Sequence, residues 1–215
     1  AGFLLASLLP FLMMILLFTG SMSIAPESIA GEKERGTIAT LLVTPLKRWE
    51  LALGKMVSIS CIALLSGTSS FLGFMLSLPR MVGGAAEGMG ALYGVTDYLL
   101  LFAVIVSTVM LFVGLISLIS AYARTIKEAT TSVSPLMVLA MLVGVMAMFS
   151  SEAQASPLFY LIPAYNSVQS MVGIFSFTGN PLLVLETVVV NLAIAAVCVV
   201  VLTKMFNNEK IVFAR

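Results

Sequence analysis

The sequence contains no histidine and only two cysteines. Without an imidazole, neither a histidine general base nor a histidine-ligated metal site is available. Cys61 and Cys198 each lie alone within an apolar stretch, a pattern that favours small packing residues over a disulfide or a metal site. The phosphate-binding pattern G-x-x-x-x-G-K-[S/T] is also missing, so we expect no metal, no cofactor and no ATP site on this chain.

Charged residues are scarce as well. They make up 10% of the chain, against 60% hydrophobic residues, and the mean hydropathy is +1.12. An ordinary soluble domain has roughly 45–50% apolar and about 25% charged residues. A soluble fold could not cover so much apolar surface with so few charges, so the composition indicates a protein whose solvent is the lipid bilayer. The net charge of +1 gives no reason to expect nucleic acid as a partner.

Five apolar stretches are each long enough to cross a hydrocarbon core, which takes about 20 residues as a helix. Because backbone polar groups must be paired in lipid, each stretch is expected to be helical. The sequence therefore predicts an all-α, polytopic transmembrane helical bundle that forms a single domain over residues 1–215. The predicted spans are residues 3–24, 56–78, 98–121, 129–149 and 182–203.

Basic residues lie almost wholly on one side of these five spans, and Arg80 alone falls on the other side. Lys and Arg concentrate in cytoplasmic segments, so segment 26–55 and the C-terminus are predicted to be cytoplasmic in a cell (inner or plasma) membrane. Ala1 is then outside, without a translocation signal before it. We therefore expect an upstream span, and six spans in a longer protein. The cytoplasmic basic residues are Lys33, Arg35, Lys47, Arg48, Lys55, Arg124, Lys127, Lys204, Lys210 and Arg215.

The outer segment 150–181 is too apolar for an ordinary loop. Residues 157–163 and 171–177 suggest short helices that dip into the outer leaflet. Non-helical backbone at that depth needs cover from protein. We expect re-entrant helices packed against their neighbours before the last span, and an interfacial loop resting on the headgroups is the alternative.

The cytoplasmic segment 26–55 carries both charge signs and an apolar face. Ile38, Leu41 and Leu42 share one helical face at i, i+3, i+4 spacing, after a charged run. Thr44-Pro45 is expected to end this helix, because proline clashes inside a helix but fits the first turn of a new one. An amphipathic helix over residues 26–44 suits contact with a soluble protein, and a plain interfacial connector is the alternative.

The same segment resembles the signature of type-2 ABC exporter permeases, and within that group it looks most similar to the sodium-efflux branch. The order of the spans and the tail Asn208-Glu209-Lys210-Ile211 are also similar. The residues that carry the resemblance are Gly31-Glu32-Lys33-Glu34-Arg35-Gly36-Thr37, then Leu41-Leu42-Val43-Thr44-Pro45, then Trp49-Glu50-Leu51-Ala52-Leu53-Gly54-Lys55.

The resemblance implies a six-span permease that pairs with a second permease copy, as a homodimer or a heterodimer. Each half docks on a separate ATP-binding cassette subunit, which holds ATP and Mg²⁺, through a coupling helix that here covers residues 26–44. This sequence departs from the sodium-efflux branch in lacking the first span and the large outer domain. The implied ATPase-subunit contacts are Glu32, Lys33, Glu34, Arg35, Gly36 and Thr37, with Arg124, Lys127 and Glu128 as secondary contacts.

Polar residues within the spans are the candidates for a transport pathway and for helix packing. Glu186 is shallow enough to anchor at the interface, and Asn191 is placed for an interhelical hydrogen bond; either one is a candidate pathway residue. The second span also carries a stripe of small residues, which lets another helix approach closely, from the same chain or from a second copy. This stripe is Ser66, Ser70, Gly73 and Ser77.

These features favour a permease of an ATP-driven exporter that works by alternating access. The resemblance implies sodium as a candidate cargo, and the sparsely charged spans are also compatible with a small amphiphile. The alternative is an ion-coupled secondary transporter, a class that usually carries ionisable groups near the membrane midplane. Glu186 is the only charged residue within a span, and it lies near one end. An intramembrane enzyme is disfavoured because the spans hold no histidine and no paired carboxylates.

Overall fold

The computed structural model describes residues 2–37, 47–81, 94–149, 153 and 156–207. Within these residues the regular structure is helical and no strand occurs, which confirms the all-α prediction. The helices are α1 (Gly2–Glu34), α3 (Arg48–Met81), α5 (Val95–Tyr122), α6 (Ile126–Met148), the 3-10 helix η1 (Pro157–Leu161), α7 (Tyr165–Phe175) and α8 (Pro181–Phe206).

Five of these helices are long and apolar enough to cross a membrane, and they correspond to the five predicted spans. Helix α3 differs from its predicted range mainly at its start, because it already begins at Arg48, within the segment assigned to the cytoplasmic connection. The candidate spans are Leu8–Glu34, Arg48–Ser69, Val95–Tyr122, Ile126–Met146 and Pro181–Phe206.

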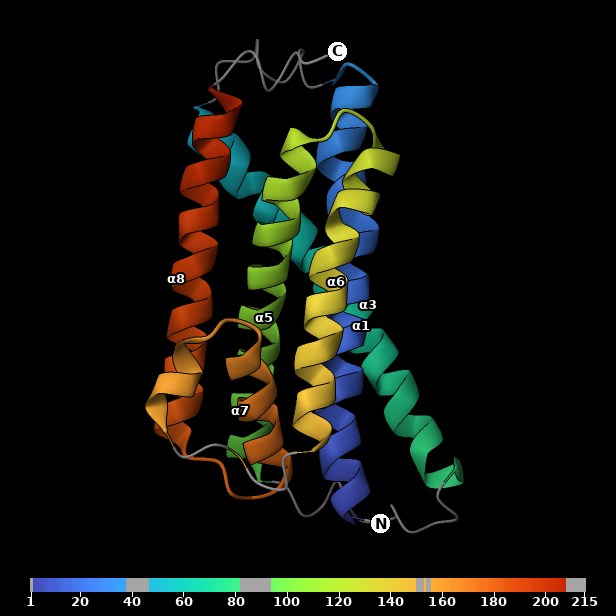
Figure 1. The fold of residues 1–215 in the computed structure, drawn as a ribbon, viewed down its shortest axis with the longest axis vertical. Helices are drawn as coiled ribbons and strands as arrows, with labels where there is room; N and C mark the ends of the chain where they lie inside the picture. The colour runs from blue at the N-terminus through green and yellow to red at the C-terminus, as the bar shows by residue number, and fades with distance from the viewer. Residues whose placement is uncertain (1, 38–46, 82–93, 150–152, 154–155, 208–215) are drawn as a thin grey trace.

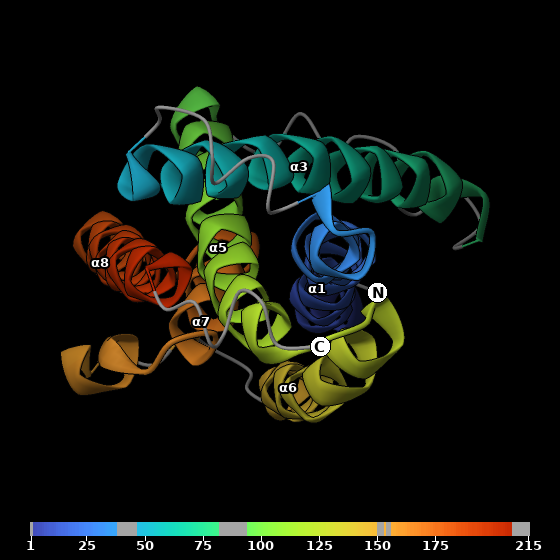
Figure 2. The same cartoon turned by 90° about the horizontal axis from the view of Figure 1, so that it is seen from above.

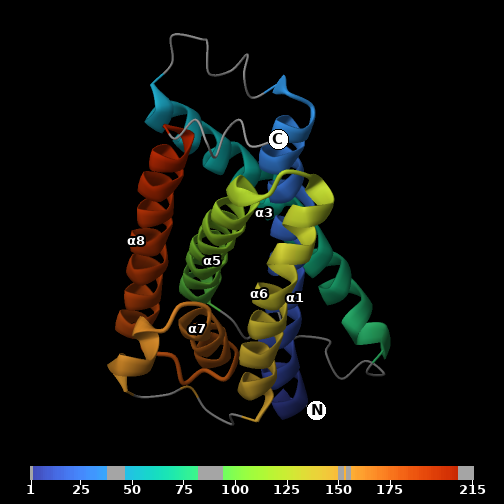
Figure 3. The same cartoon turned by 45° about the horizontal axis from the view of Figure 1, so that its top comes forward.

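The bundle is organised around α1 and α5. Helix α1 contacts α3, α5 and α6, and α5 in turn packs against α8 (Figure 1). Helix α3 is strongly tilted and passes across α1 and α5 on one side of the bundle (Figure 2). Helix α7 lies at one end of the bundle (Figure 3). We call the other end, which holds Glu34, Arg48, Tyr122, Ile126 and Phe206, the charged end.

The core between α1 and α5 consists of large apolar side chains. The rings of Phe18 and Phe112 meet edge to face with their centroids 5.0 Å apart. Both rings are buried, as is Leu17. Where α1 crosses α3, a Cβ on Gly67 would lie 2.7 Å from Cδ2 of Leu17, so glycine permits the close approach. Small residues at helix crossings are expected in lipid, where van der Waals packing drives helix association.

The two cysteines have different surroundings. Cys198 is buried where α5 crosses α8, and a Cβ on Gly114 would lie 3.0 Å from Cβ of Cys198. Cys198 is therefore a packing residue, as predicted. Cys61 is exposed on the outside of the bundle, so the same prediction is wrong for Cys61 within this chain.

Helix α1 is longer than predicted at the charged end. The sequence analysis placed a separate amphipathic helix over residues 26–44, but α1 continues through Pro26 to Glu34. Proline removes one backbone hydrogen bond and crowds the preceding turn. Because Pro26 and Ile29 are both buried against the bundle, tertiary packing offsets this cost and the helix does not end. Residues 38–46, where the predicted coupling helix ends, lie outside the described residues.

The segment before α8 forms two short helices, as predicted, but the second one, α7, begins at Tyr165 and not at the predicted residue 171. Residues 166–175 of α7 are all buried, and the helix contacts α1, α5, α6 and α8. Its end is fixed by a close backbone approach: the N–H of Gly179 donates to the carbonyl of Gly173 at 2.9 Å. A Cβ on Gly173 would lie 3.0 Å from the Cα of Gly179, so a larger residue would require the backbone at Gly179 to shift. The re-entrant position of α7 in a membrane remains a prediction.

Candidate functional site

Three consecutive charged residues near the end of α1 each bind a different helix. Glu32 contacts α3, Lys33 contacts α5 and Glu34 contacts α6. Successive residues of an α-helix point about 100° apart, so three neighbours can reach three helices packed around one axis. We call Glu32, Lys33 and Glu34 the α1 junction.

The first contact of the junction is an ion pair between Glu32 and Lys55 of α3. Lys55 also donates to the carbonyl of Ser28 at 3.1 Å. The side chains of Lys55 and Glu32 are only 11% and 26% exposed, so both charges are largely removed from water. Removing one partner of such a pair leaves the other charge uncompensated, which is strongly destabilising. The pair therefore fixes the start of α3 to the end of α1.

The other two contacts of the junction hold both sides of the turn between α5 and α6. Lys33 Nζ donates to the carbonyl of Ala121 at 2.9 Å, near the end of α5. Glu34 Oε2 accepts from the N–H of Ile126 at 2.9 Å, at the first residue of α6. The last carbonyls and first N–H groups of helices lack partners within the helix. A cation at the C-terminus and an anion at the N-terminus also complement the two helix dipoles.

The turn between α5 and α6 has its own capping bonds. The Oγ1 of Thr125 accepts from the N–H of Glu128 at 3.1 Å, and Oε2 of Glu128 accepts from the N–H of Arg124 at 2.8 Å. Thr-x-x-Glu is the capping-box pattern of helix N-termini, so this pair could have been predicted from the sequence. Glu128 therefore has a structural role here, while the side chains of Arg124 and Lys127 are exposed.

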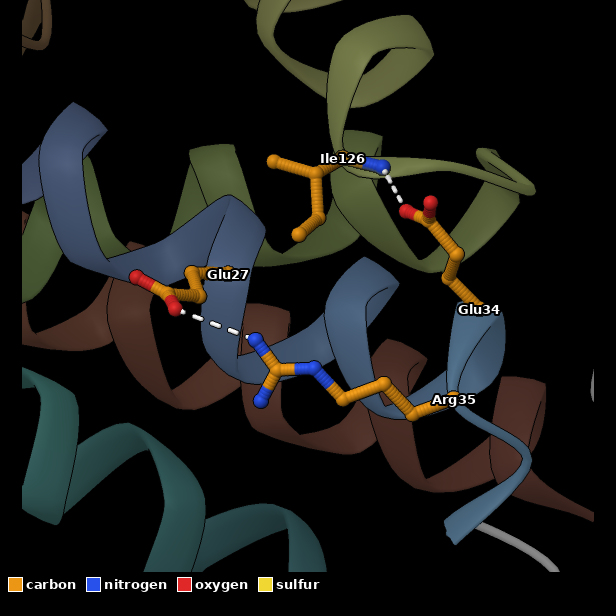
Figure 4. Close-up of polar contacts among 4 residues, drawn as sticks. All are labelled: Glu27, Glu34, Arg35 and Ile126. Atoms are coloured by element: carbon orange, nitrogen blue, oxygen red, sulfur yellow. Dashed lines mark hydrogen bonds and ion pairs between the residues drawn. The ribbon is translucent and has the colours of Figure 1, made fainter.

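The exposed end of α1 follows directly after the junction. Gly36 has a φ of +74°, the left-handed conformation typical of the glycine that ends a helix. Its N–H donates to the carbonyl of Lys33 at 3.1 Å. Arg35 reaches back to Glu27 at 3.2 Å (Figure 4). Their side chains are 63% and 62% exposed, so this pair contributes little to stability.

The predicted contact residues thus divide into two groups. Glu32, Lys33 and Glu34 bind other helices, although Glu34 is itself exposed. Residues 35–37 are exposed at the charged end, and the bonds of Arg35 to Glu27 and of Thr37 to Glu32 stay within the α1 segment. The secondary contacts predicted at Arg124 and Lys127 are next to this exposed group, because Glu34 binds the turn that carries them. The structure therefore brings the primary and secondary predicted contacts together at one end.

A buried polar cluster joins α7 to α8 and α5 at the other end of the bundle. Asn191 accepts from Nδ2 of Asn166 at 3.1 Å and donates to Oγ of Ser167 at 2.9 Å. The hydroxyls of Ser170 and Thr187 are 2.8 Å apart. All five residues are buried. Asn191 therefore makes the interhelical hydrogen bonds predicted for it, and its partners on α7 were not identified from the sequence.

Comparison with known proteins identifies the family of this helical bundle. Residues 2–204 match the family described as "ABC-2 family transporter protein", which covers nearly the whole chain. The chain belongs to the ABC-2 transporter family. It is thus a multi-pass permease component, a type of membrane subunit that lacks an ATPase domain.

A distant relative of this permease is the "ABC transporter permease protein NatB" of Bacillus subtilis (strain 168). The two chains are 25% identical over 173 residues, which cover 77% of this permease and 43% of the relative. The chain therefore matches less than half the length of that relative. No solved structure matches this permease.

Glu186 of the permease lies outside the buried polar cluster. Its side chain is half-buried in α8 near η1. Burial raises the pKa of Tyr160 in η1, and the negative charges of Tyr165 and Glu186 raise it further. Glu186 is therefore close to Tyr160 at the α7 end. Whether Glu186 or Asn191 lines a transport pathway stays a prediction.

Of the small-residue stripe predicted on the second span, only Ser66 has a described side chain, and a Cβ on Gly20 of α1 would lie 3.4 Å from its Oγ. Helix α3 meets α1 through buried Ala63 and Gly67, while Ser66 is exposed at the edge of this contact. The side chains of Ser70 and Ser77 are not among those described. A role for this stripe in packing against a second copy remains a prediction.

Proposed function

We propose that this permease is the membrane-spanning subunit of an ATP-driven exporter, with the charged end as its contact with a separate ATP-binding cassette subunit. The observation that carries the proposal is the α1 junction. Exposed residues 35–37 continue directly from a helix end that is fixed to α3, α5 and α6. A partner that pushes or pulls on residues 35–37 therefore acts on α3, α5 and α6 together. Alternating access driven by a partner requires such a joint movement of helices.

The charged end is proposed to face the cytoplasm. The connections at this end carry the basic residues of the α1–α3, α5–α6 and C-terminal segments, and Lys and Arg mark cytoplasmic segments. The ATP and Mg²⁺ are held by the partner subunit, and this chain contributes no cofactor site. In this arrangement α7 is re-entrant from the outer side.

Segment 26–55 is proposed as the coupling segment, and two groups of its residues are proposed to have different roles. Residues 35–37, together with Arg124 and Lys127, are the direct contacts with the ATP-binding subunit because they are exposed at one end. The α1 junction acts behind these contacts by holding the helices. The permease works with a second permease copy, and sodium or a small amphiphile is the proposed cargo, as the family resemblance suggests.

The test is co-purification of the tagged full-length permease in mild detergent, with ATPase activity assayed in the eluate. We expect an ATP-binding subunit to co-elute with the wild type and to be lost from the Arg35→Glu/Lys127→Glu variant. Lys204→Glu is the matched control, because it reverses an exposed basic residue at the same end of the bundle but on α8. This control should retain the subunit.

Two results would contradict the proposal. If no ATPase accompanies the wild type, the exporter assignment fails and the ion-coupled secondary transporter with Glu186 as its ionisable group takes its place. If the Arg35→Glu/Lys127→Glu variant retains the subunit as well as the control does, the contact lies elsewhere on the permease.

A further inference from the structure

Two neighbouring residues of α1 hold the α5–α6 turn from both sides with charges that match the two helix ends. Lys33 binds the last turn of α5 and Glu34 binds the first N–H of α6. We propose that Glu34 is a positioning residue that makes α6 follow the end of α1 when the ATP-binding subunit moves it. The inference rests on the proposed function and adds that α6 is the helix that moves with the end of α1.

Helix α6 depends on α1 for its position. The two helices touch near both ends. At the charged end a Cβ on Gly31 would lie 3.3 Å from Cδ1 of Ile126, and further along a Cβ on Gly144 would lie 2.7 Å from Cδ2 of Phe11. Only 22% of the most apolar stretch of α6 is buried in the chain, the smallest share among the five candidate spans. Besides α1, helix α6 contacts α5 and α7, each less extensively than it contacts α1.

Helix α5 differs from α6 although a short turn joins them. Its apolar stretch is 61% buried, and it packs extensively against α8 as well as α1. A displacement of the end of α1 therefore meets resistance at α5 but little at α6. Lys33 holds the α5 side of the turn, and this side stays in place as the pivot. Glu34 moves the α6 side of the turn around it.

The Glu34 carboxylate accepts a hydrogen bond from the backbone N–H of Ile126 (Figure 4). Substitutions at position 34 can therefore weaken this bond in two steps, because they change the acceptor and leave the backbone donor in place. Gln at position 34 keeps an oxygen that can accept this hydrogen bond and loses only the charge. Ala removes both. A positioning role therefore predicts that Glu34→Gln retains the coupled movement and that Glu34→Ala loses it.

The experiment measures spin-label distances in the full-length permease with its co-purified ATP-binding subunit in lipid nanodiscs. Cys61 and Cys198 are first replaced by serine. One label pair, at Phe149 after α6 and Leu182 on α8, reports α6; a second pair, at Val95 on α5 and Leu182, is the reference. All three labelled positions are exposed. Distances are compared without nucleotide and with ATP plus orthovanadate.

We expect the Phe149–Leu182 distance to shift with ATP and orthovanadate while the Val95–Leu182 distance does not. In complexes that retain the ATP-binding subunit, Glu34→Ala should lose the shift and Glu34→Gln should keep it. The inference is overturned if Glu34→Ala shows the wild-type shift, even with a lower Tm, or if the wild type hydrolyses ATP without any shift at α6. Failure of the ATP-binding subunit to co-purify would instead contradict the proposed function.

Discussion

At the scale of single residues, Asn191 shows why a polar side chain is kept within an apolar helix. A buried amide in lipid surroundings has no water to replace a missing partner. Asn191 satisfies its oxygen with Asn166 and its nitrogen with Ser167, so one residue of α8 fixes two residues of α7. These hydrogen bonds add to the apolar packing of α7, which places Val168, Met171, Val172, Ile174 and Phe175 in the core.

The corresponding prediction concerns Asn191→Ala. Truncation leaves the buried side chains of Asn166 and Ser167 without their partner, and we expect a loss of roughly 1–2 kcal/mol with a lower Tm in detergent. Leu192→Ala is the control, because that neighbouring side chain is 42% exposed on the outside of the chain and should change the Tm little. Equal Tm values for both variants would show that the cluster does not hold α7.

The sequence predicted the role of Asn191 but not its partners. A polar residue inside an apolar run must find a hydrogen bond, which is a local argument. The identity of Asn166 and Ser167 as partners depends on how α7 packs, and no local pattern contains that information. The partners of Lys33 and Glu34 were even less accessible to a local argument, since they lie 88 and 92 residues away in the sequence.

At the scale of elements, hydropathy located the five long helices because lipid imposes a minimum apolar length. It did not locate their ends. The first span was expected to end near residue 24, with a separate helix after it, but α1 continues through buried Pro26 to Glu34. The α5–α6 turn was identified as a short link, but its capping by Thr125 and Glu128 was missed although the Thr-x-x-Glu spacing is visible in the sequence.

A second prediction tests the charge matching at the α5–α6 turn. In the Lys33→Glu/Glu34→Lys variant the composition is unchanged, but each charge faces the wrong helix end and Lys cannot accept from the N–H of Ile126. We expect a loss of roughly 1–2 kcal/mol, measured as a lower Tm of the purified permease.

The matched control for this swap is Glu27→Arg/Arg35→Glu, which exchanges a charge on α1 with one directly after it, both more than half exposed. Surface pairs contribute little, so its Tm should stay close to that of the wild type. If both swaps lower the Tm equally, the effect arises from charge near the end of α1 in general and not from the two helix ends.

At the scale of the whole molecule, the bundle has two ends of different character. The α7 end is closed by a buried helix and polar hydrogen bonds between neutral side chains. The charged end joins α1, α3, α5 and α6 through charged side chains and presents residues 35–37, Arg124 and Lys127 on its surface. Under the proposed function, the charged end is the end that responds to the ATP-binding partner.

The most direct test of this account is photo-crosslinking in membranes, with a benzoylphenylalanine introduced in turn at Arg35, Lys127, Phe149 and Leu182 of the full-length permease. The account predicts crosslinks to the ATP-binding subunit from Arg35 and Lys127, at the charged end, and none from Phe149 and Leu182, at the α7 end. Crosslinks from the α7 end alone, or an ATP-binding subunit that co-purifies yet crosslinks to neither Arg35 nor Lys127, would contradict it.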